Sequence, residues 1–268
     1  MLQGMFAKKS IATFIDGIFF NGIIFSFAAL IFSKNAIHCQ SPVIIFGFIF
    51  GLLTLLFQLC YIKAMAYGNI SLTVLIVNLS MIIPIIVSVF VFGEVLTATK
   101  VLGFFLIVIT LFMSVDRNEK SAHFKKWLTF SALSFLLNGA LAVTQQIFGR
   151  TIWKNESSAF VAWSYIIAAI LSLVLYLLLK FRGNKTTFKI KPSVFENGLC
   201  IGVILGVFQL LNTKAIATID GLFLFPTYNG GTLILSSIFS VIFLKDKLKP
   251  HQTISIIIGI FAIIIINL

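Results

Sequence analysis

Charged side chains are scarce in this 268-residue chain. Asp, Glu, Lys and Arg together make up 10% of its residues, whereas hydrophobic residues make up 59%. In a soluble globular domain about a quarter of the residues are charged. The composition therefore excludes an ordinary soluble domain and predicts an integral membrane protein.

Residues that build metal centres and catalytic sites are also few. None of the 3 cysteines forms a CxxC pair, so neither a disulfide framework nor a metal site is indicated. The sequence contains no HExxH, GxSxG or phosphate-binding loop, and no nucleophile can be paired with a base. We predict no metal, no cofactor and no enzymatic activity, and an intramembrane enzyme is the weakest alternative.

Acidic residues are outnumbered by basic ones, 8 against 20, which gives a net charge of +12. Nearly all Lys and Arg stand in short segments between apolar runs, a distribution typical of membrane topology rather than of a nucleic-acid-binding surface. We therefore predict the lipid bilayer as a partner and no nucleic-acid partner.

The hydrophobic residues are concentrated in nine runs, of which the fourth and the ninth are short. A helix crosses a hydrocarbon core about 30 Å thick with about 20 apolar residues. The runs cover residues 11–33, 43–66, 71–93, 101–115, 127–148, 158–180, 194–217, 221–244 and 252–268. We predict an all-α, multi-pass protein of the cell (plasma) membrane with nine transmembrane helices.

The basic residues also predict an orientation. Counted on alternate sides of these spans, 14 Lys and Arg lie on the side of Lys8 and 4 on the opposite side. Because positive residues concentrate in cytoplasmic loops, the N-terminus is predicted inside and the C-terminus outside.

One stretch of the sequence occurs twice. Residues 57–66 and 208–217 are identical at six of ten positions, and the match extends back to two glycines in each copy. The copies lie on the second and seventh spans, an odd number of crossings apart, so they run through the membrane in opposite directions. The pattern predicts an inverted duplication, a plan that recurs in secondary transporters.

The repeat places small and polar residues on one helical face. Steps of three and four residues align Gly47, Gly51 and Gln58 on the second span. The equivalent residues of the seventh span are Gly198, Gly202 and Gln209. Small residues allow helices to approach closely in lipid, whereas the glutamines serve either as hydrogen-bonding glue or as ligand contacts. Both interpretations stay open at this point.

Polar side chains inside the spans are the predicted substrate-binding residues. They are Gln58, Asn78, Asn138, Gln145, Gln209, Asn212, Tyr228 and Asn229. Several of them stand close to predicted helix breaks. A proline breaks a helix because it has no N–H to donate to the carbonyl four residues earlier. The predicted breaks are at Pro84, Pro226, Gly230 and Gly231. Interrupted helices often line a transporter's site, although a simple kink is the alternative.

The acidic residues near the spans have different predicted roles. Asp16 is the one charge well inside a span, which makes it a candidate for proton coupling, unless it reaches the membrane interface. Glu94 and Asp246 stand at helix ends, and we interpret them as structural turn acids.

Two motifs carry a family resemblance. Residues 92–97 (FGEVLT), followed by Lys100 and Gly103 and preceded by Pro84, resemble the end of an EamA-type half in the drug/metabolite transporter superfamily. Residues 243–248 (FLKDKL), followed by Gln252, are similar to the second-half equivalent, and residues 226–228 (PTY) are similar to a pattern in the penultimate helix.

The resemblance implies ten helices in two inverted five-helix halves around a central cavity. The predicted halves are residues 1–115 and 127–268, joined by a connecting loop at 116–126. The first half has four spans, and subtracting 151 from the span at 158–180 gives 7–29. The element without a counterpart is thus the family's first helix.

The predicted function is that of a secondary transporter or exporter of a small organic metabolite or drug-like solute, working by alternating access. Because few charges line the predicted site, the solute is expected to be neutral, zwitterionic or weakly charged. A lipid or lipid-linked sugar flippase is the alternative. The sequence indicates neither the oligomeric state nor the direction of transport.

Overall fold

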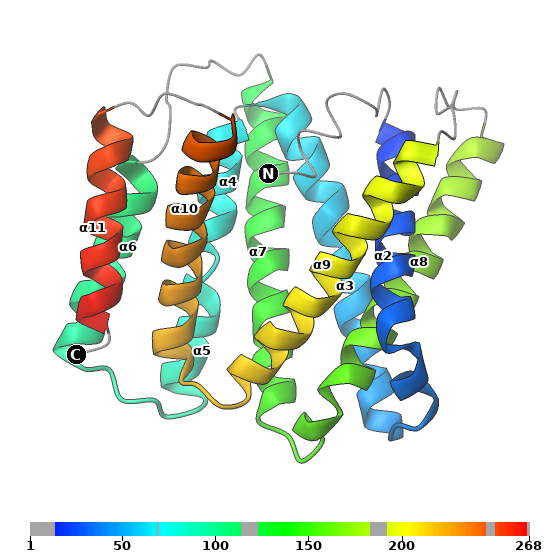
Figure 1. The fold of residues 1–268 in the computed structure, drawn as a ribbon, viewed down its shortest axis with the longest axis horizontal. Coiled ribbons are helices and arrows are strands. Elements are labelled where there is room, and N and C mark those ends of the chain that lie inside the picture. The colour runs from blue at the N-terminus through cyan, green and yellow to red at the C-terminus, as the bar shows by residue number, and fades with distance from the viewer. Residues whose placement is uncertain (1–13, 69, 114–122, 183–191, 245–249, 267–268) are drawn as a thin grey trace. The chain divides into compact units, whose positions relative to one another are not determined.

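The computed structural model describes the chain except for residues 1–13, 69, 114–122, 183–191, 245–249 and 267–268. The regular secondary structure of the described residues is entirely helical (Figure 1). The helices are α2 (Phe14–Ile37), α3 (Ser41–Tyr67), α4 (Ile70–Leu79), α5 (Ile82–Phe90), α6 (Ala98–Met113), α7 (Phe124–Gly149), the short 3-10 helix η1 (Lys154–Glu156), α8 (Ser157–Phe181), α9 (Pro192–Ile216), α10 (Gly221–Leu244) and α11 (Pro250–Ile266).

The all-α membrane fold is thereby confirmed. Eight of the nine predicted spans each correspond to one helix, and the third corresponds to α4 and α5 together. Within the described ranges, 6 helical stretches are long and apolar enough to cross a membrane, and two shorter apolar helices, in α6 and α11, accompany them.

The chain folds into two compact units, each of which combines two separate segments of the sequence. Unit 1 contains residues 1–59 and 144–217, and unit 2 contains residues 60–143 and 218–268. Consequently α3 and α7 each pass from one unit into the other. The predicted halves, 1–115 and 127–268, describe the duplication and not these units, and they stay a prediction.

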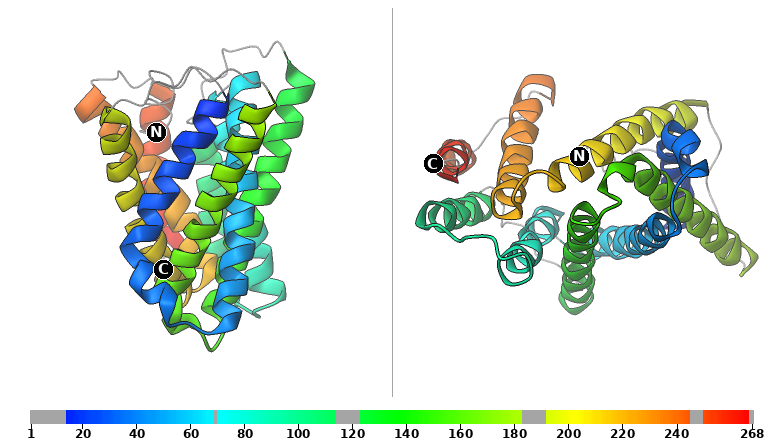
Figure 2. Two further views of the ribbon diagram at one scale, coloured as in Figure 1. Left: turned by 90° about the vertical axis from the view of Figure 1, so that its right-hand side faces the viewer. Right: turned by 90° about the horizontal axis from the view of Figure 1, so that it is seen from below.

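Unit 1 is built around the antiparallel pair α2 and α8, which lie side by side (Figures 1 and 2). Near the middle of the pair the rings of Phe25 and Tyr165 stack, with their centroids 5.8 Å apart. Toward one end Phe19 contacts Tyr176 at 4.8 Å. Apolar packing at the centre of this unit is therefore made by the helices that precede the two repeat copies.

The repeat glycines let α3 and α9 press against this pair. A Cβ atom at Gly51 would lie 2.5 Å from the carbonyl oxygen of Ser164 on α8, and one at Gly202 would lie 2.6 Å from that of Ile24 on α2. Both contacts are with backbone, so only glycine fits without a shift of the helices. Since α3 and α9 run in opposite directions in Figure 1, each copy packs on the other half in the same way.

These contacts also give the register of the internal symmetry. Gly202 meets Ile24 and Phe27, whereas Gly51 meets Ser164 and Ile167. The matching residues of α2 and α8 are thus 140 positions apart and not the 151 that relate α3 to α9. The longer connection between α8 and α9, together with one more turn at the end of α8, accounts for the difference.

Unit 2 contains α4, α5, α6, α10, α11, the end of α3 and the first part of α7. The antiparallel helices α6 and α11 approach closely where a Cβ at Gly259 would lie 3.1 Å from Cγ2 of Thr110. Thr110 and the neighbouring Ile107 are fully buried. Small and branched side chains thus form the contact between these two short helices.

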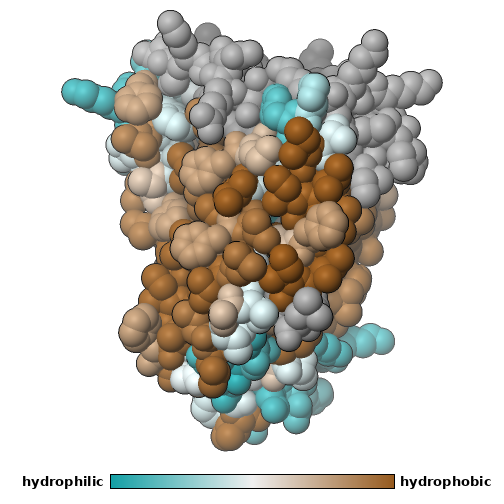
Figure 3. Space-filling view, turned by 90° about the vertical axis from the view of Figure 1, so that its left-hand side faces the viewer, coloured by the Kyte–Doolittle hydropathy of each residue, from teal (hydrophilic) through white to brown (hydrophobic). Residues whose placement is uncertain are grey.

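The outer face of α6, α10 and α11 is apolar over most of its height, with hydrophilic residues toward both ends (Figure 3). Its exposed large residues are Leu102, Phe105, Ile109, Phe112, Leu235, Ile254, Ile257, Ile260, Phe261 and Ile264. Such a face is expected where lipid chains surround a helix.

The predicted helix breaks have different outcomes. The third span is interrupted at Ser80 and Met81, four and three residues before Pro84, and the Ser80 carbonyl accepts a bond from the Ile83 amide at 3.0 Å. By contrast α10 continues without interruption through Pro226, Gly230 and Gly231, which corrects the prediction of a break there.

The continuity of α10 has a physical basis. Pro226 is the sixth residue of the helix, so its missing N–H removes only the bond to the Leu222 carbonyl. Gly230 has a packing role, because a Cβ there would lie 2.5 Å from Cδ1 of Ile107 on α6. Neither Gly230 nor Gly231 adopts a positive φ.

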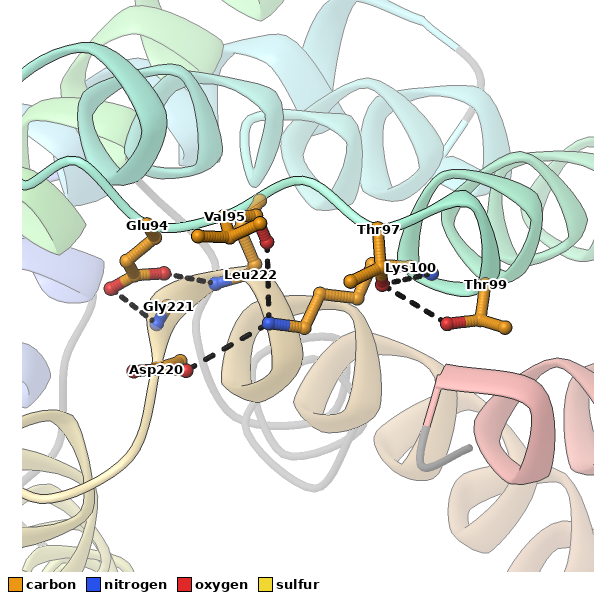
Figure 4. Close-up of polar contacts among 8 residues, drawn as sticks. All are labelled: Glu94, Val95, Thr97, Thr99, Lys100, Asp220, Gly221 and Leu222. Atoms are coloured by element: carbon orange, nitrogen blue, oxygen red, sulfur yellow. Dashed lines mark hydrogen bonds and ion pairs between the residues drawn. The ribbon is translucent and has the colours of Figure 1, made fainter.

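Glu94 caps the start of α10 (Figure 4). Its Oε1 accepts a hydrogen bond from the Gly221 amide at 3.0 Å, and its Oε2 accepts one from the Leu222 amide at 2.9 Å. The chain reaches this position through Gly93, whose φ of 67° favours glycine. Glu94 is therefore a structural acid, as predicted. It accepts bonds from two amides that lack partners within the helix, and its negative charge lies at the positive end of the helix dipole. Asp246 lies outside the described residues.

An ion pair lies beside this cap. Lys100 Nζ is 3.8 Å from Asp220 Oδ2 and donates a hydrogen bond to the Val95 carbonyl at 3.5 Å (Figure 4). Asp220 is exposed, so solvent screens this ion pair. We therefore assign most of the stabilisation of the start of α10 to Glu94.

Gly202→Ala is expected to lower the stability of the protein by about 1–3 kcal/mol, because the added methyl meets backbone that cannot turn aside. Gly231→Ala is the matched control, since a Cβ there meets nothing within 4 Å and alanine favours a helix. Thermal unfolding in detergent measures both. A loss for Gly202→Ala no larger than for Gly231→Ala would contradict the close helix contact.

Glu94→Gln is expected to destabilise the protein by about 0.5–2 kcal/mol, because the amide nitrogen cannot accept a backbone bond and the charge at the helix start is lost. Hydrogen exchange at Gly221 and Leu222 should accelerate. The exposed Glu196, on α9, provides the control Glu196→Gln. Unchanged exchange at the start of α10 would show that the cap contributes nothing.

Candidate functional site

The predicted site residues divide between the two units. Unit 1 carries Gln58, Gln145, Gln209 and Asn212, whereas unit 2 carries Asn78, Asn138, Tyr228 and Asn229. Each unit thus has a polar group of its own, inside helices that are otherwise apolar.

In unit 1, α7 and α9 are joined by a chain of hydrogen bonds. Asn212 Nδ2 donates to Gln145 Oε1 at 3.2 Å, and Gln145 Nε2 donates to Thr213 Oγ1 at 2.6 Å. The Thr213 hydroxyl in turn donates to the Gln209 carbonyl at 2.8 Å. Gln145 and Thr213 are both buried. The oxygen and the nitrogen of the Gln145 side-chain amide each have a hydrogen-bond partner in the protein. Gln145 therefore acts as glue between two helices.

The two repeat glutamines are in a different situation. Gln58 is half-buried on α3, and Gln209 lies on the buried face of α9 with 9% of its surface exposed. Neither side-chain amide makes a hydrogen bond with the residues that the structure describes. A primary amide offers two donors and an acceptor, so these groups retain hydrogen-bonding capacity for another molecule.

In unit 2, Asn138 bridges the interruption between α4 and α5. Its Nδ2 donates to Ser80 Oγ at 2.7 Å and lies 3.4 Å from the Val77 carbonyl oxygen. The next residue, Gly139, packs closely on Ile83 of α5. Asn138 therefore serves polar groups at the broken helix, which is where interrupted backbone needs partners.

The remaining predicted residues of unit 2 lie on α4 and α10. Asn78 lies in the last turn of α4 and its side chain is half-buried. Its backbone carbonyl accepts a hydrogen bond from the Met81 amide at 3.3 Å. Asn229 Nδ2 donates to the Phe225 carbonyl at 2.8 Å. Tyr228 is 39% exposed. Asn229 is thus engaged with its own helix.

Several buried polar residues were not predicted. Thr213 joins the chain described above, and Trp127 Nε1 donates to Thr73 Oγ1 at 2.8 Å, fixing α7 to α4. Asn21 is buried inside α2. A hydroxyl inside a helix often bonds to its own backbone, so Thr73 and Thr213 carry no sequence signal, whereas an asparagine within an apolar run does.

Asp16 lies in the first turn of α2 and is fully buried. At the spacing of 140 that relates α2 to α8, its equivalent is Glu156. Glu156 Oε2 accepts a hydrogen bond from the Gln40 amide at 3.1 Å, just before α3 begins. The equivalence gives Asp16 a structural alternative to proton coupling, namely a bond to backbone near the start of a neighbouring helix.

The predicted substrate-binding residues of both units are amides and a phenol, none of which carries a formal charge. Among the described residues, no group of 3 or more His, Cys, Asp and Glu side chains could hold a metal ion. The arrangement suits hydrogen bonding to an uncharged or zwitterionic molecule.

Comparison with known proteins agrees with this fold. Residues 2–115 match the sequence model of the EamA-like transporter family. A solved structure, described as "Crystal structure of protein", aligns with 99% of this chain and 92% of its own chain, with a TM-score of 0.79 at 14% sequence identity. None of the curated proteins compared with the chain matches it. The predicted resemblance to the EamA-like transporter family is therefore confirmed by sequence over residues 2–115. The solved structure shows that the fold itself is shared over nearly the whole chain.

Proposed function

We propose that the protein is a secondary transporter of a small neutral or zwitterionic organic solute, located in the plasma membrane and working by alternating access between its inverted repeats. The observation that carries this proposal is the pair Gln58 and Gln209. Their amides stand at equivalent repeat positions and are not used by the described residues.

Amides suit such a solute because they donate and accept without a formal charge. A charged solute that leaves water needs a charged partner to offset desolvation, whereas hydroxyl, amide or paired zwitterionic groups are matched by neutral hydrogen bonds. Gln58 and Gln209 supply these bonds, and Gln145 holds the supporting helices together.

Asp16 is the candidate for coupling transport to protons. A fully buried acid in a transmembrane segment can exchange a proton when the protein changes state. Glu156, at the equivalent position, is half-buried and bonded to the Gln40 amide. Comparing substitutions of Asp16 and Glu156 therefore distinguishes proton coupling from capping of a neighbouring helix.

A flippase for a lipid or lipid-linked sugar is the second candidate. It requires a polar path that opens to the lipid, along which a headgroup can cross. The lipid-facing cavity of unit 1, at α2, α8 and α9, has Ser26 as the one polar residue among its described lining. This favours the solute transporter.

Gln58→Ala and Gln209→Ala are each expected to raise the KM for the solute about fivefold, the effect of losing one neutral hydrogen bond worth about 1 kcal/mol. Counterflow in proteoliposomes with a panel of labelled zwitterionic amino acids and neutral sugars identifies a solute and measures KM. Asn155→Ala, at an exposed residue of η1, is the control.

Gln145→Ala should behave differently, lowering the melting temperature because Thr213 and Asn212 lose their partner. Unchanged KM in both Gln58→Ala and Gln209→Ala, for a solute that is transported, would remove them from the site.

Asp16→Asn is expected to leave solute exchange intact and to abolish its response to a pH gradient, because the amide cannot carry a proton. Glu156→Gln is the matched control and should keep the response. Flux with and without an imposed pH gradient measures both. A response retained in Asp16→Asn would assign Asp16 to capping alone.

A further inference from the structure

Unit 1 has a cavity of about 300 Å³ bounded by α2, α8 and α9. It is lined by Phe19, Gly22, Ile23, Ser26, Phe27, Ala169, Ile170, Leu173 and Phe195. None of the predicted substrate-binding residues is among them. The cavity is therefore separate from the polar group formed by α7 and α9.

The lining of this cavity is apolar and open to the outside. Its one hydroxyl, on Ser26, donates to the Gly22 carbonyl at 2.8 Å and is thus satisfied within α2. Ile170, Leu173 and Phe195 are 52%, 49% and 43% exposed. On membrane-spanning helices such a surface faces lipid chains.

A positive charge stands beside one end of the cavity. Phe19 packs on Tyr176 with centroids 4.8 Å apart, and Lys180 Nζ lies 5.9 Å from the centroid of the Tyr176 ring. Arg182 follows at the end of α8 and is exposed. The order along the helices is thus an apolar cavity, an aromatic pair and then two cations.

The internal symmetry shows that one residue of the cavity lining differs in size from its equivalent. The equivalent of Ile23 is Trp163: a Cβ at Gly198 would lie 2.7 Å from Ile23 Cγ2, and one at Gly47 would lie 2.6 Å from Trp163 Cβ. The Trp163 indole N–H donates to the Ala36 carbonyl at 3.2 Å. A large ring therefore stands on one side where the smaller Ile23 leaves room on the other.

We propose that this cavity binds an acyl chain of an anionic phospholipid, whose phosphate group contacts Lys180 and Arg182. The acyl chain makes van der Waals contacts with the cavity lining, which an empty apolar cavity would lack. Anionic headgroups are attracted to basic residues next to a transmembrane helix, and by the positive-inside rule this end faces the cytoplasmic leaflet, where anionic lipids are enriched. The proposal does not depend on which solute is transported.

Native mass spectrometry of the full chain in detergent tests the assignment. The probes are dioleoyl phosphatidylglycerol and dioleoyl phosphatidylcholine, which share their acyl chains, and inorganic phosphate. The first bound phosphatidylglycerol is expected to have a Kd at least fivefold below that of phosphatidylcholine. Inorganic phosphate, which lacks the chains, should not bind.

Two sets of variants separate the chain from the headgroup. Ile23→Trp copies the ring found at the equivalent position, and Ser26→Phe fills the cavity from an exposed residue; each should weaken both lipids at least fivefold. Leu30→Phe, on an exposed part of α2 outside the cavity, is the control. Lys180→Gln combined with Arg182→Gln should raise the Kd of phosphatidylglycerol to that of phosphatidylcholine. Lys154→Gln, next to the opposite end of α8, should not.

Several outcomes would overturn the proposal. Equal affinities for the two lipids, or an unchanged Kd in both Ile23→Trp and Ser26→Phe, would show that lipid does not use this cavity. A dimer that Ser26→Phe abolishes would show that a second copy of the chain covers it. Binding of inorganic phosphate as tight as that of the lipid would reduce the site to its two cations.

Discussion

The close approach of helix backbones in unit 1 is the constraint on which its other features depend. In lipid, apolar side chains gain little from meeting one another, so helices associate through packing and hydrogen bonds. Gly51 and Gly202 bring α3 and α9 within reach of the carbonyl oxygens of α8 and α2. This contact fixes the height and rotation of α9, and thereby places Asn212 and Thr213 against Gln145 of α7.

Polar side chains in these helices have two roles, structural and ligand-binding. Their hydrogen-bond partners show which role each side chain has. Gln145 and Asn138 are bonded to residues of neighbouring helices, so they stabilise contacts that apolar surfaces alone would not hold. Gln58 and Gln209 lack such partners among the described residues. Similar amide chemistry therefore separates into structural and ligand-accessible groups only when the hydrogen bonds are known, and residue type alone does not show which is which.

The sequence predicted the spans well because an apolar run must become a helix in a bilayer, where backbone groups need partners within the segment. It predicted the interruption before Pro84 but not the continuity of α10 through Pro226. A proline in the sequence shows which backbone hydrogen bond is lost. Whether the helix continues past it depends on the packing of the neighbouring helices. The register between α2 and α8 was likewise hidden, because connections of unequal length separate them from the repeat copies.

The internal symmetry is kept where helices pack and lost where molecules could bind. Gly51 and Gly202 make the same backbone contact, and Phe25 stacks on its own equivalent, Tyr165. By contrast the smaller Ile23 is the equivalent of Trp163, and Ile23 lines the lipid-facing cavity described above. A duplicated fold needs identical contacts to close the same interface twice. Binding carries no such requirement, so side chains that face open space diverge between the copies, and these differences indicate where ligands are to be sought.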